Sequence, residues 1–194
     1  MQNKKVIGID LDDVLLDFNT AFIKYHNIVY KSDLNLRSKY NHAFDKFLGC
    51  DKEEAERRIL EFYETDDHDR VLPIQGAPEA IQKLSQNNSL IIITARPERL
   101  REWVSLWLGK HYGDIFSGLY FTNQFHGTGI VKTKGETCKE LGVDIFIDDH
   151  IKHIEEVALT GIKVLLFDMP WNQGELGFGI TRVYSWEDIL KELS

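Results

Sequence analysis

The sequence is poor in cysteine and in positive charge, and it has no long apolar run. Two cysteines, Cys50 and Cys138, are too few for a disulfide framework and lack metal-site spacing, so we expect reduced thiols. Lys and Arg total 23 against 31 Asp and Glu, a net charge of -8, which disfavours polymeric nucleic acid as a partner. No apolar run approaches the ~20 residues that cross a bilayer, and no signal-peptide segment is recognisable. These absences predict a soluble, cytoplasmic protein with no membrane partner.

The chain has the length of one domain, or of one domain with an insert, at 194 residues. Short apolar runs alternate with amphipathic stretches, which is typical of a parallel sheet with crossover helices. The runs lack period-2 alternation, so we expect strands covered on both faces. The fold class predicted is α/β, a doubly wound parallel sheet. The expected strands are 6–9, 90–93, 144–147 and 163–167, with 119–121 as a fifth candidate.

Helix signals lie between these runs. Prolines suit the first turn of two helices, a Thr133–Glu136 capping box opens a third, and Ser185 caps the last. The two proline-led helices begin near Pro78 and Pro97.

One stretch interrupts the alternation of strands and helices. Residues 18–72 contain no strand-like run, and Phe18, Phe22 and Tyr25 share one helical face. Asp51 followed by Glu54 predicts a capped helix in the same stretch. We therefore expect residues 1–17 and 73–194 to form the α/β core and residues 18–72 to form an inserted helical cap.

Carboxylates gather at the ends of the predicted strands. Asp10 and Asp12 follow the first strand, Asp148 and Asp149 follow the 144–147 strand, and Thr94 ends the 90–93 strand. The carboxyl ends of parallel strands share one edge of the sheet, where open α/β folds bind ligands. So many carboxylates repel one another unless a cation lies among them, and a ligand set of oxygens alone suits Mg²⁺.

This residue set can perform phosphoryl transfer. One carboxylate can attack phosphorus as a nucleophile, and another can donate a proton to the leaving oxygen and then accept one from water. Thr94 and a lysine, either Lys132 or Lys134, can hold the phosphate oxygens as charge shifts in the transition state. The sequence therefore predicts chemistry on a small phosphate ester.

In their order and spacing, these motifs resemble the haloacid dehalogenase-like (HAD) hydrolase superfamily. The resemblance implies a Rossmann-like core with a cap inserted after the first strand. It implies Asp10 as the nucleophile that forms an aspartyl-phosphate and Asp12 as the general acid/base. Mg²⁺ would be held by Asp10, the backbone carbonyl of Asp12 and Asp148, with Asp149 in support. Thr94 and a lysine would bind phosphate.

Two stretches carry a closer resemblance within the superfamily, Asp10 to Phe18 and the tail that contains Pro170-Trp171-Asn172. They are similar to the 5′(3′)-deoxyribonucleotidase-like branch and its bacterial nucleotidase members. Lys134 is preferred to Lys132 because it opens the capped helix where the family lysine usually lies. In this branch a phenylalanine at the position of Phe18 stacks on a nucleobase, although Phe18 could equally pack the cap on the core.

Thr94-Ala95-Arg96 replaces the Thr-Ser of the characterised nucleotidases, so one hydroxyl on the phosphate side is missing. Arg96 could compensate by pointing into the site, or it could bind another substrate group.

The sequence therefore predicts a Mg²⁺-dependent phosphatase of nucleoside monophosphates. The alternative is a HAD phosphatase of a sugar phosphate or another small metabolite. A phospho-acceptor signalling domain is disfavoured, because its acidic pair comes early and no helical cap separates its motifs. The sequence leaves open the preference for 5′ or 3′ and for deoxy or ribo substrates, and whether the protein is a homodimer.

Overall fold

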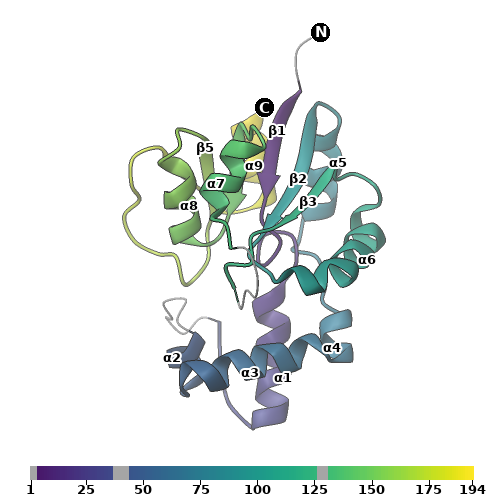
Figure 1. Cartoon of the computed structure of the whole chain (residues 1–194), viewed down its shortest axis with the longest axis vertical. Coiled ribbons are helices and arrows are strands. Elements are labelled where there is room, and N and C mark those ends of the chain that lie inside the picture. Colours follow the sequence, from purple (N-terminus) through teal and green to yellow (C-terminus); the bar gives the residue numbers. More distant parts are fainter. Residues whose placement is uncertain (1–3, 37–43, 126–130) are drawn as a thin grey trace.

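The computed structural model describes residues 4–36, 44–125 and 131–194 (Figure 1). In these ranges six parallel strands form one sheet in the order β3-β2-β1-β4-β5-β6. Both neighbours of β1 come from later in the chain, so the two predicted acidic segments emerge side by side at the centre of the sheet. The strands are β1 (Lys5–Ile9), β2 (Asn88–Thr94), β3 (Gly118–Phe121), β4 (Ile145–Asp148), β5 (Lys163–Phe167) and β6 (Ile180–Val183).

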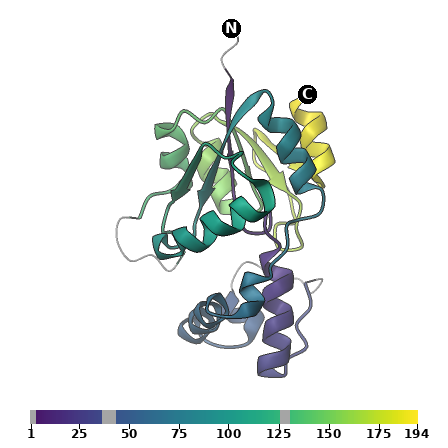
Figure 2. The ribbon, with the colours of Figure 1, turned by 90° about the vertical axis from the view of Figure 1, so that its right-hand side faces the viewer.

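Helices cover both faces of the sheet, as the apolar strands require (Figure 2). Two clusters of buried side chains mark the two faces. The first cluster includes residues of α5 (Ala77–Ser85), α6 (Arg101–Tyr112) and α9 (Trp186–Leu193). The second includes residues of α7 (Lys134–Glu140) and α8 (Ile151–Ala158). A short 3-10 turn, η1 (Glu98–Leu100), precedes α6.

The predicted α/β class is confirmed, and all five expected strands are present. The Thr133–Glu136 capping box is formed in both directions, and the Ser185 side chain accepts the Asp188 amide. The strand β6 was missed because it is a four-residue edge strand whose first three residues are only half-buried. Its sequence, Ile-Thr-Arg-Val, carries no continuous apolar run to mark it.

In the described residues five helices lie between β1 and β2, and the first four of them form a cap beyond the carboxyl ends of the strands (Figures 1 and 2). These four are α1 (Phe18–Tyr30), α2 (Phe44–Leu48), α3 (Lys52–Tyr63) and α4 (Asp66–Asp69). Aromatic rings fill the space between the helices, with Phe22 and Phe62 both fully buried. The two chain segments that join cap and core run together, since the Asp17 amide donates to the Leu72 carbonyl at 3.0 Å.

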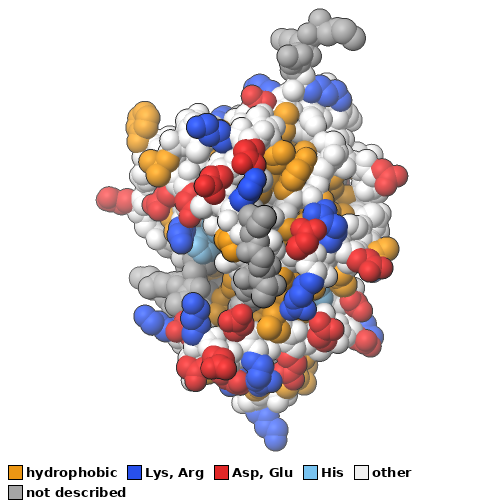
Figure 3. All heavy atoms as spheres, viewed as in Figure 1, with side chains coloured by type: hydrophobic (Ala, Val, Ile, Leu, Met, Phe, Trp, Pro, Cys, Tyr) orange, Lys and Arg blue, Asp and Glu red, His pale blue; other side chains and the backbone are white. Residues whose placement is uncertain are grey.

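Charges of both signs are interspersed on the face of the molecule in Figure 3, with no basic stripe across it. Among the helices of the described ranges, none has the length and apolar character needed to cross a bilayer.

Candidate active site

Three buried carboxylates meet at the carboxyl edge of the sheet. Oxygens of Asp10, Asp148 and Asp149 all lie within 4.8 Å of one another. Asp10 comes directly after β1, Asp148 ends β4 and Asp149 follows it. The pairing of β1 with β4 continues one residue beyond β1, since the Asp10 amide donates to the Ile147 carbonyl at 2.9 Å. The adjacency of two strands far apart in the sequence thus brings the acidic motifs together.

A buried lysine joins two of these carboxylates. Lys134 Nζ lies 2.7 Å from Asp10 Oδ1 and 2.7 Å from Asp148 Oδ2, and the Lys134 side chain has no solvent exposure. Lys134 is the first residue of α7, so the Thr133 cap fixes its position. By contrast, Lys132 is half-exposed and pairs with Glu140 at 2.7 Å. Of the two candidate lysines, the structure therefore brings Lys134 to the carboxylates.

The pKa values of these carboxylates are shifted because the three groups are buried and lie close together. Burial raises the pKa of Asp10 to about 7, against the lowering effect of Lys134. Burial, with the charge of Asp148, also raises the pKa of Asp149 well above its usual range. For Asp148, burial is outweighed by Lys134 and His153, which hold its pKa well below the ordinary value. One ammonium group does not balance three buried carboxylates, so the cluster favours a further cation.

The segment after β5 holds Asp149 in place. Trp171 Nε1 donates to Asp149 Oδ2 at 2.7 Å, and Asn172 Nδ2 donates to the Asp149 backbone carbonyl at 2.7 Å. The sequence by itself assigned no role to Trp171 or Asn172. Their position in the sequence could have indicated a role, since an indole and a side-chain amide that follow the carboxyl end of a strand lie at the same sheet edge as the carboxylates.

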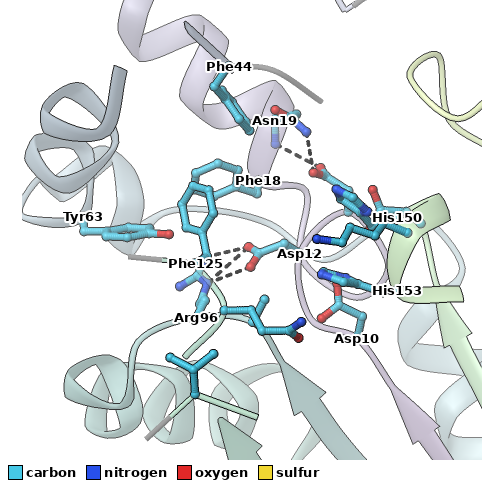
Figure 4. Close-up of a pocket in the computed structure, with 16 residues that line it drawn as sticks. Asp10, Asp12, Phe18, Asn19, Phe44, Tyr63, Arg96, Phe125, His150 and His153 are labelled. Carbon is cyan, nitrogen blue, oxygen red and sulfur yellow. Dashed lines mark hydrogen bonds and ion pairs between the residues drawn. The ribbon is translucent and has the colours of Figure 1, made fainter. Parts of the chain in front are cut away.

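Asp12 lies apart from the three-carboxylate cluster and binds Arg96 instead. Arg96 Nε lies 2.9 Å from Asp12 Oδ2, and Arg96 Nη2 lies 2.8 Å from Asp12 Oδ1 (Figure 4). Thr94 is fully buried, and its hydroxyl accepts the Arg96 amide at 3.2 Å. Asp13 adopts a positive φ of 55° and accepts hydrogen bonds from both the backbone amide and the side-chain amide of Asn19, which ties the turn after β1 to α1.

These groups open onto a cavity of about 470 Å³ between the sheet edge and the cap (Figure 4). Its lining includes Asp10, Asp12 and Arg96 from the core, while Phe18 reaches it from α1. Phe18 also stacks on Phe22 with ring centroids 5.7 Å apart, so it belongs both to the cap interior and to the cavity wall. Thr94, Lys134 and Asp148 lie beneath the lining and do not form part of it.

Sequence reasoning missed several lining residues. The cap supplies Phe44 and Tyr63, and the loop after β3 supplies Phe125. These rings carry no motif, because their approach to the site depends on how the cap folds over the sheet. Two histidines, His150 and His153, stack with centroids 4.4 Å apart, and His153 Nδ1 lies 3.3 Å from Asp148 Oδ2.

Comparison with known proteins agrees with this geometry. Residues 4–193 match the family model described as 5′ nucleotidase, deoxy (pyrimidine), cytosolic type C protein (NT5C). The chain belongs to this family. It is 28% identical over 184 residues to nucleotidase CA_C3379 of Clostridium acetobutylicum, covering 94% of this chain and 90% of the relative. It is also 28% identical over 193 residues to the 5′(3′)-deoxyribonucleotidase of Bacillus subtilis, covering 98% of this chain and 99% of that protein.

The fold of this NT5C family member is HAD-like. The structure superposes on the haloacid dehalogenase-like hydrolase SP0104 from Streptococcus pneumoniae with a TM-score of 0.68, 15% identity and full coverage of both chains. The predicted superfamily, the capped α/β core and the nucleotidase branch are therefore confirmed.

The residues of the NT5C site fit a metal cation. The donor set consists of carboxylate oxygens alone, which hard divalent cations prefer. All three carboxylates are buried, and burial raises the pKa of Asp10 and Asp149. A divalent cation there would offset the mutual repulsion that the single Lys134 ammonium leaves.

Proposed function

We propose that this protein is a Mg²⁺-dependent phosphatase of nucleoside monophosphates that works through an aspartyl-phosphate on Asp10. The observation that carries the proposal is the position of Asp10, which faces the cavity, pairs with the buried Lys134 and lies beside two further buried carboxylates. A buried, oriented carboxylate beside a cation site is suited to attack phosphorus. Asp10 and Asp148 are proposed as side-chain ligands of Mg²⁺ together with the Asp12 carbonyl, and Asp149 supports them.

The reaction proceeds in two displacements. In the first, an Asp10 carboxylate oxygen bonds to phosphorus, the bond from phosphorus to the ester oxygen breaks, and Asp12 donates a proton to the leaving alcohol. In the second, Asp12 accepts a proton from water as the water oxygen bonds to phosphorus and the bond from phosphorus to the Asp10 oxygen breaks, which releases phosphate and restores the Asp10 carboxylate. Bound Mg²⁺ would neutralise charge on the phosphoryl oxygens.

Thr94 and Lys134 are proposed to hold the phosphoryl group. Lys134 supplies a buried positive charge at the sheet edge, where charge develops on the equatorial oxygens. Thr94 lies at the end of β2 beneath the cavity lining, and its hydroxyl accepts the Arg96 amide, so it orients this loop. Its proposed contact is with a phosphoryl oxygen that reaches below the lining residues.

The remainder of the cavity favours a nucleoside as the leaving group. About 470 Å³ is within the range of small-ligand pockets, and Phe18, Phe44, Tyr63 and Phe125 give it an aromatic wall. Aromatic rings stack on any nucleobase, because every base offers a π-face. The names of the two sequence relatives, nucleotidase and 5′(3′)-deoxyribonucleotidase, support the same class of substrate. We place the enzyme in the cytoplasm, with residues 18–72 acting as the substrate cap.

A panel of phosphate esters tests the proposal. We expect phosphate release from nucleoside monophosphates in Mg²⁺ and little release after chelation. The panel includes 5′ and 3′ monophosphates of ribo- and deoxyribonucleosides, together with sugar phosphates. Turnover confined to sugar phosphates would overturn the substrate class and favour the alternative of a metabolite phosphatase. No turnover of any ester by folded protein supplied with Mg²⁺ would overturn the phosphatase itself.

Mg²⁺ is also expected to stabilise the folded protein. A ligand that binds the folded state alone adds about 2.7 kcal/mol to the free energy of unfolding at a concentration of one hundred times its Kd. We therefore expect Mg²⁺ to raise the thermal unfolding midpoint of metal-free wild-type protein, and to raise that of the Asp149→Asn variant less. An exposed aspartate, Asp114, serves as the matched control, and Asp114→Asn should keep the full gain. Equal gains in all three proteins would contradict the carboxylate cluster as the binding site.

A further inference from the structure

The hydrogen-bonding groups of the Arg96 side chain are already engaged by other residues of the protein. Its side chain is 1% exposed, and its guanidinium presents an edge to both oxygens of Asp12. A third nitrogen, Nη1, lies 3.2 Å from His68 Nε2. Because Asp12 occupies the forked edge of the guanidinium, that edge is not available to a substrate anion.

Aromatic rings surround the same guanidinium. The Arg96 Cζ atom lies 5.1 Å from the ring centroids of both Tyr63 and Trp103, and 5.6 Å from that of Phe18. Such rings stabilise a cation through their electron-rich faces, more strongly where water is excluded. Arg96 is thus fixed on several sides before any substrate arrives (Figure 4).

The surroundings of Arg96 come from both parts of the molecule. Phe18, Tyr63 and His68 belong to the cap helices α1, α3 and α4, whereas Trp103 belongs to α6 of the core. His68 stacks on Trp103 with ring centroids 3.8 Å apart, and the Trp103 indole donates to Asp69 at 2.7 Å. The guanidinium therefore stands where cap and core meet, with Asp12 as its ion-pair partner.

We propose that Arg96 is a positioning residue for the general acid/base Asp12, an inference that rests on the proposed function. A bidentate arginine fixes the plane of a carboxylate as well as its place, which a lysine cannot do. Asp12 retains 27% exposure of its side chain and lines the cavity, so it faces the reacting groups while Arg96 holds it from behind. Asp12 must meet the leaving oxygen as the protonated acid in the first step and water as the carboxylate in the second. The same fixed position serves both steps, because each oxygen that accepts from Arg96 keeps a second lone pair for the proton.

Loss of the bidentate contact between Arg96 and Asp12 is expected to lower kcat and to leave substrate binding nearly unchanged. A misplacement of about 1 Å in a catalytic group can cost about 10²-fold in rate. We expect Arg96→Met to lower kcat for a nucleoside monophosphate by about that factor and to leave KM within about twofold of wild type. A residue that bound the substrate directly would instead raise KM.

A double-mutant cycle separates the two roles. Asp12→Asn, Arg96→Met and the double variant are compared by kcat in saturating Mg²⁺. If Arg96 acts through Asp12, its removal in the Asp12→Asn background changes kcat by no more than about twofold, because the group it positions is already gone. If the two losses multiply, Arg96 acts on the substrate or on another group, and the inference is overturned.

The leaving group gives an independent readout. p-Nitrophenolate leaves without a proton, so release of the first equivalent from p-nitrophenyl phosphate does not need Asp12 as an acid. We expect Arg96→Met and Asp12→Asn to keep this first-equivalent release while both lose turnover of alkyl esters. A merely structural defect would lower both reactions together. If the panel shows turnover of sugar phosphates only, the same comparison with such an alkyl ester still tests Arg96, so failure of the proposed substrate class and failure of the Arg96 inference are distinguishable.

Controls address folding and charge. Arg99→Met removes a nearby half-exposed arginine that lies 3.7 Å from Glu64, and we expect it to leave kcat unchanged. If Arg96→Met does not fold, Arg96→Lys replaces it in the double-mutant cycle. Lysine keeps the positive charge among the aromatic rings but cannot bind both oxygens of Asp12 with a planar guanidinium. Wild-type kcat in folded Arg96→Lys would overturn the requirement for bidentate positioning.

Discussion

Phosphate release by the Asp10→Asn variant is expected to fall by about 10⁴-fold or more, the scale on which loss of a covalent nucleophile acts. The amide has nearly the shape of the carboxylate but cannot form the phosphoenzyme. Folding should be retained, because burial raises the pKa of Asp10 to about 7 and the variant removes a charge that the site disfavours. Phosphate release and the thermal unfolding midpoint, measured on the same preparation, check both expectations.

The matched control is Asp114→Asn, an exposed position after α6 that should keep wild-type turnover. Acid-quenched wild-type protein, digested and analysed by mass spectrometry, should carry phosphate on the peptide that contains Asp10. Wild-type turnover in Asp10→Asn, or phosphate on a different peptide, would assign the nucleophile to another residue.

Replacing Lys134 with methionine is expected to lower the free energy of unfolding of the metal-free protein by about 3–5 kcal/mol. The substitution leaves Asp10 and Asp148 buried without the ammonium that lies 2.7 Å from each. Removing one partner of a buried ion pair lowers the stability strongly, because the other charge stays buried without compensation. Replacing both partners by apolar residues costs much less. Chemical denaturation in the presence of a chelator measures the loss, and Mg²⁺ is expected to recover part of it.

Lys132→Met is the matched control for this substitution. Lys132 is 47% exposed and pairs with Glu140 at the surface, where an ion pair contributes at most about 1 kcal/mol. We therefore expect a small change in stability and no loss of phosphate release. Equal effects of the two substitutions would contradict the assignment of Lys134 as the buried counter-charge of the site.

The parts of the fold that the sequence predicted depend on local patterns. Five strands were recognisable because each is a continuous apolar run, and the helix at Lys134 because Thr133 and Glu136 form a reciprocal cap. The position of β6 was not recognisable, since an edge strand exposed on its outer side needs few apolar residues. The three-carboxylate cluster followed from strand ends alone, because parallel strands bring their carboxyl ends to one edge.

By itself, the sequence determined the fold class, the inserted helical cap and the identity of the acidic groups at the sheet edge. The resemblance already favoured Lys134 over Lys132, and the tertiary structure brings Lys134 to the carboxylates. Tertiary structure alone decided that Arg96 binds Asp12, a residue 84 positions earlier in the chain. It also decided which cap rings, such as Tyr63, enclose the guanidinium. The physical reason is that strand and helix patterns are encoded by neighbours in sequence, whereas the partner of a buried charge is set by the approach of cap and core.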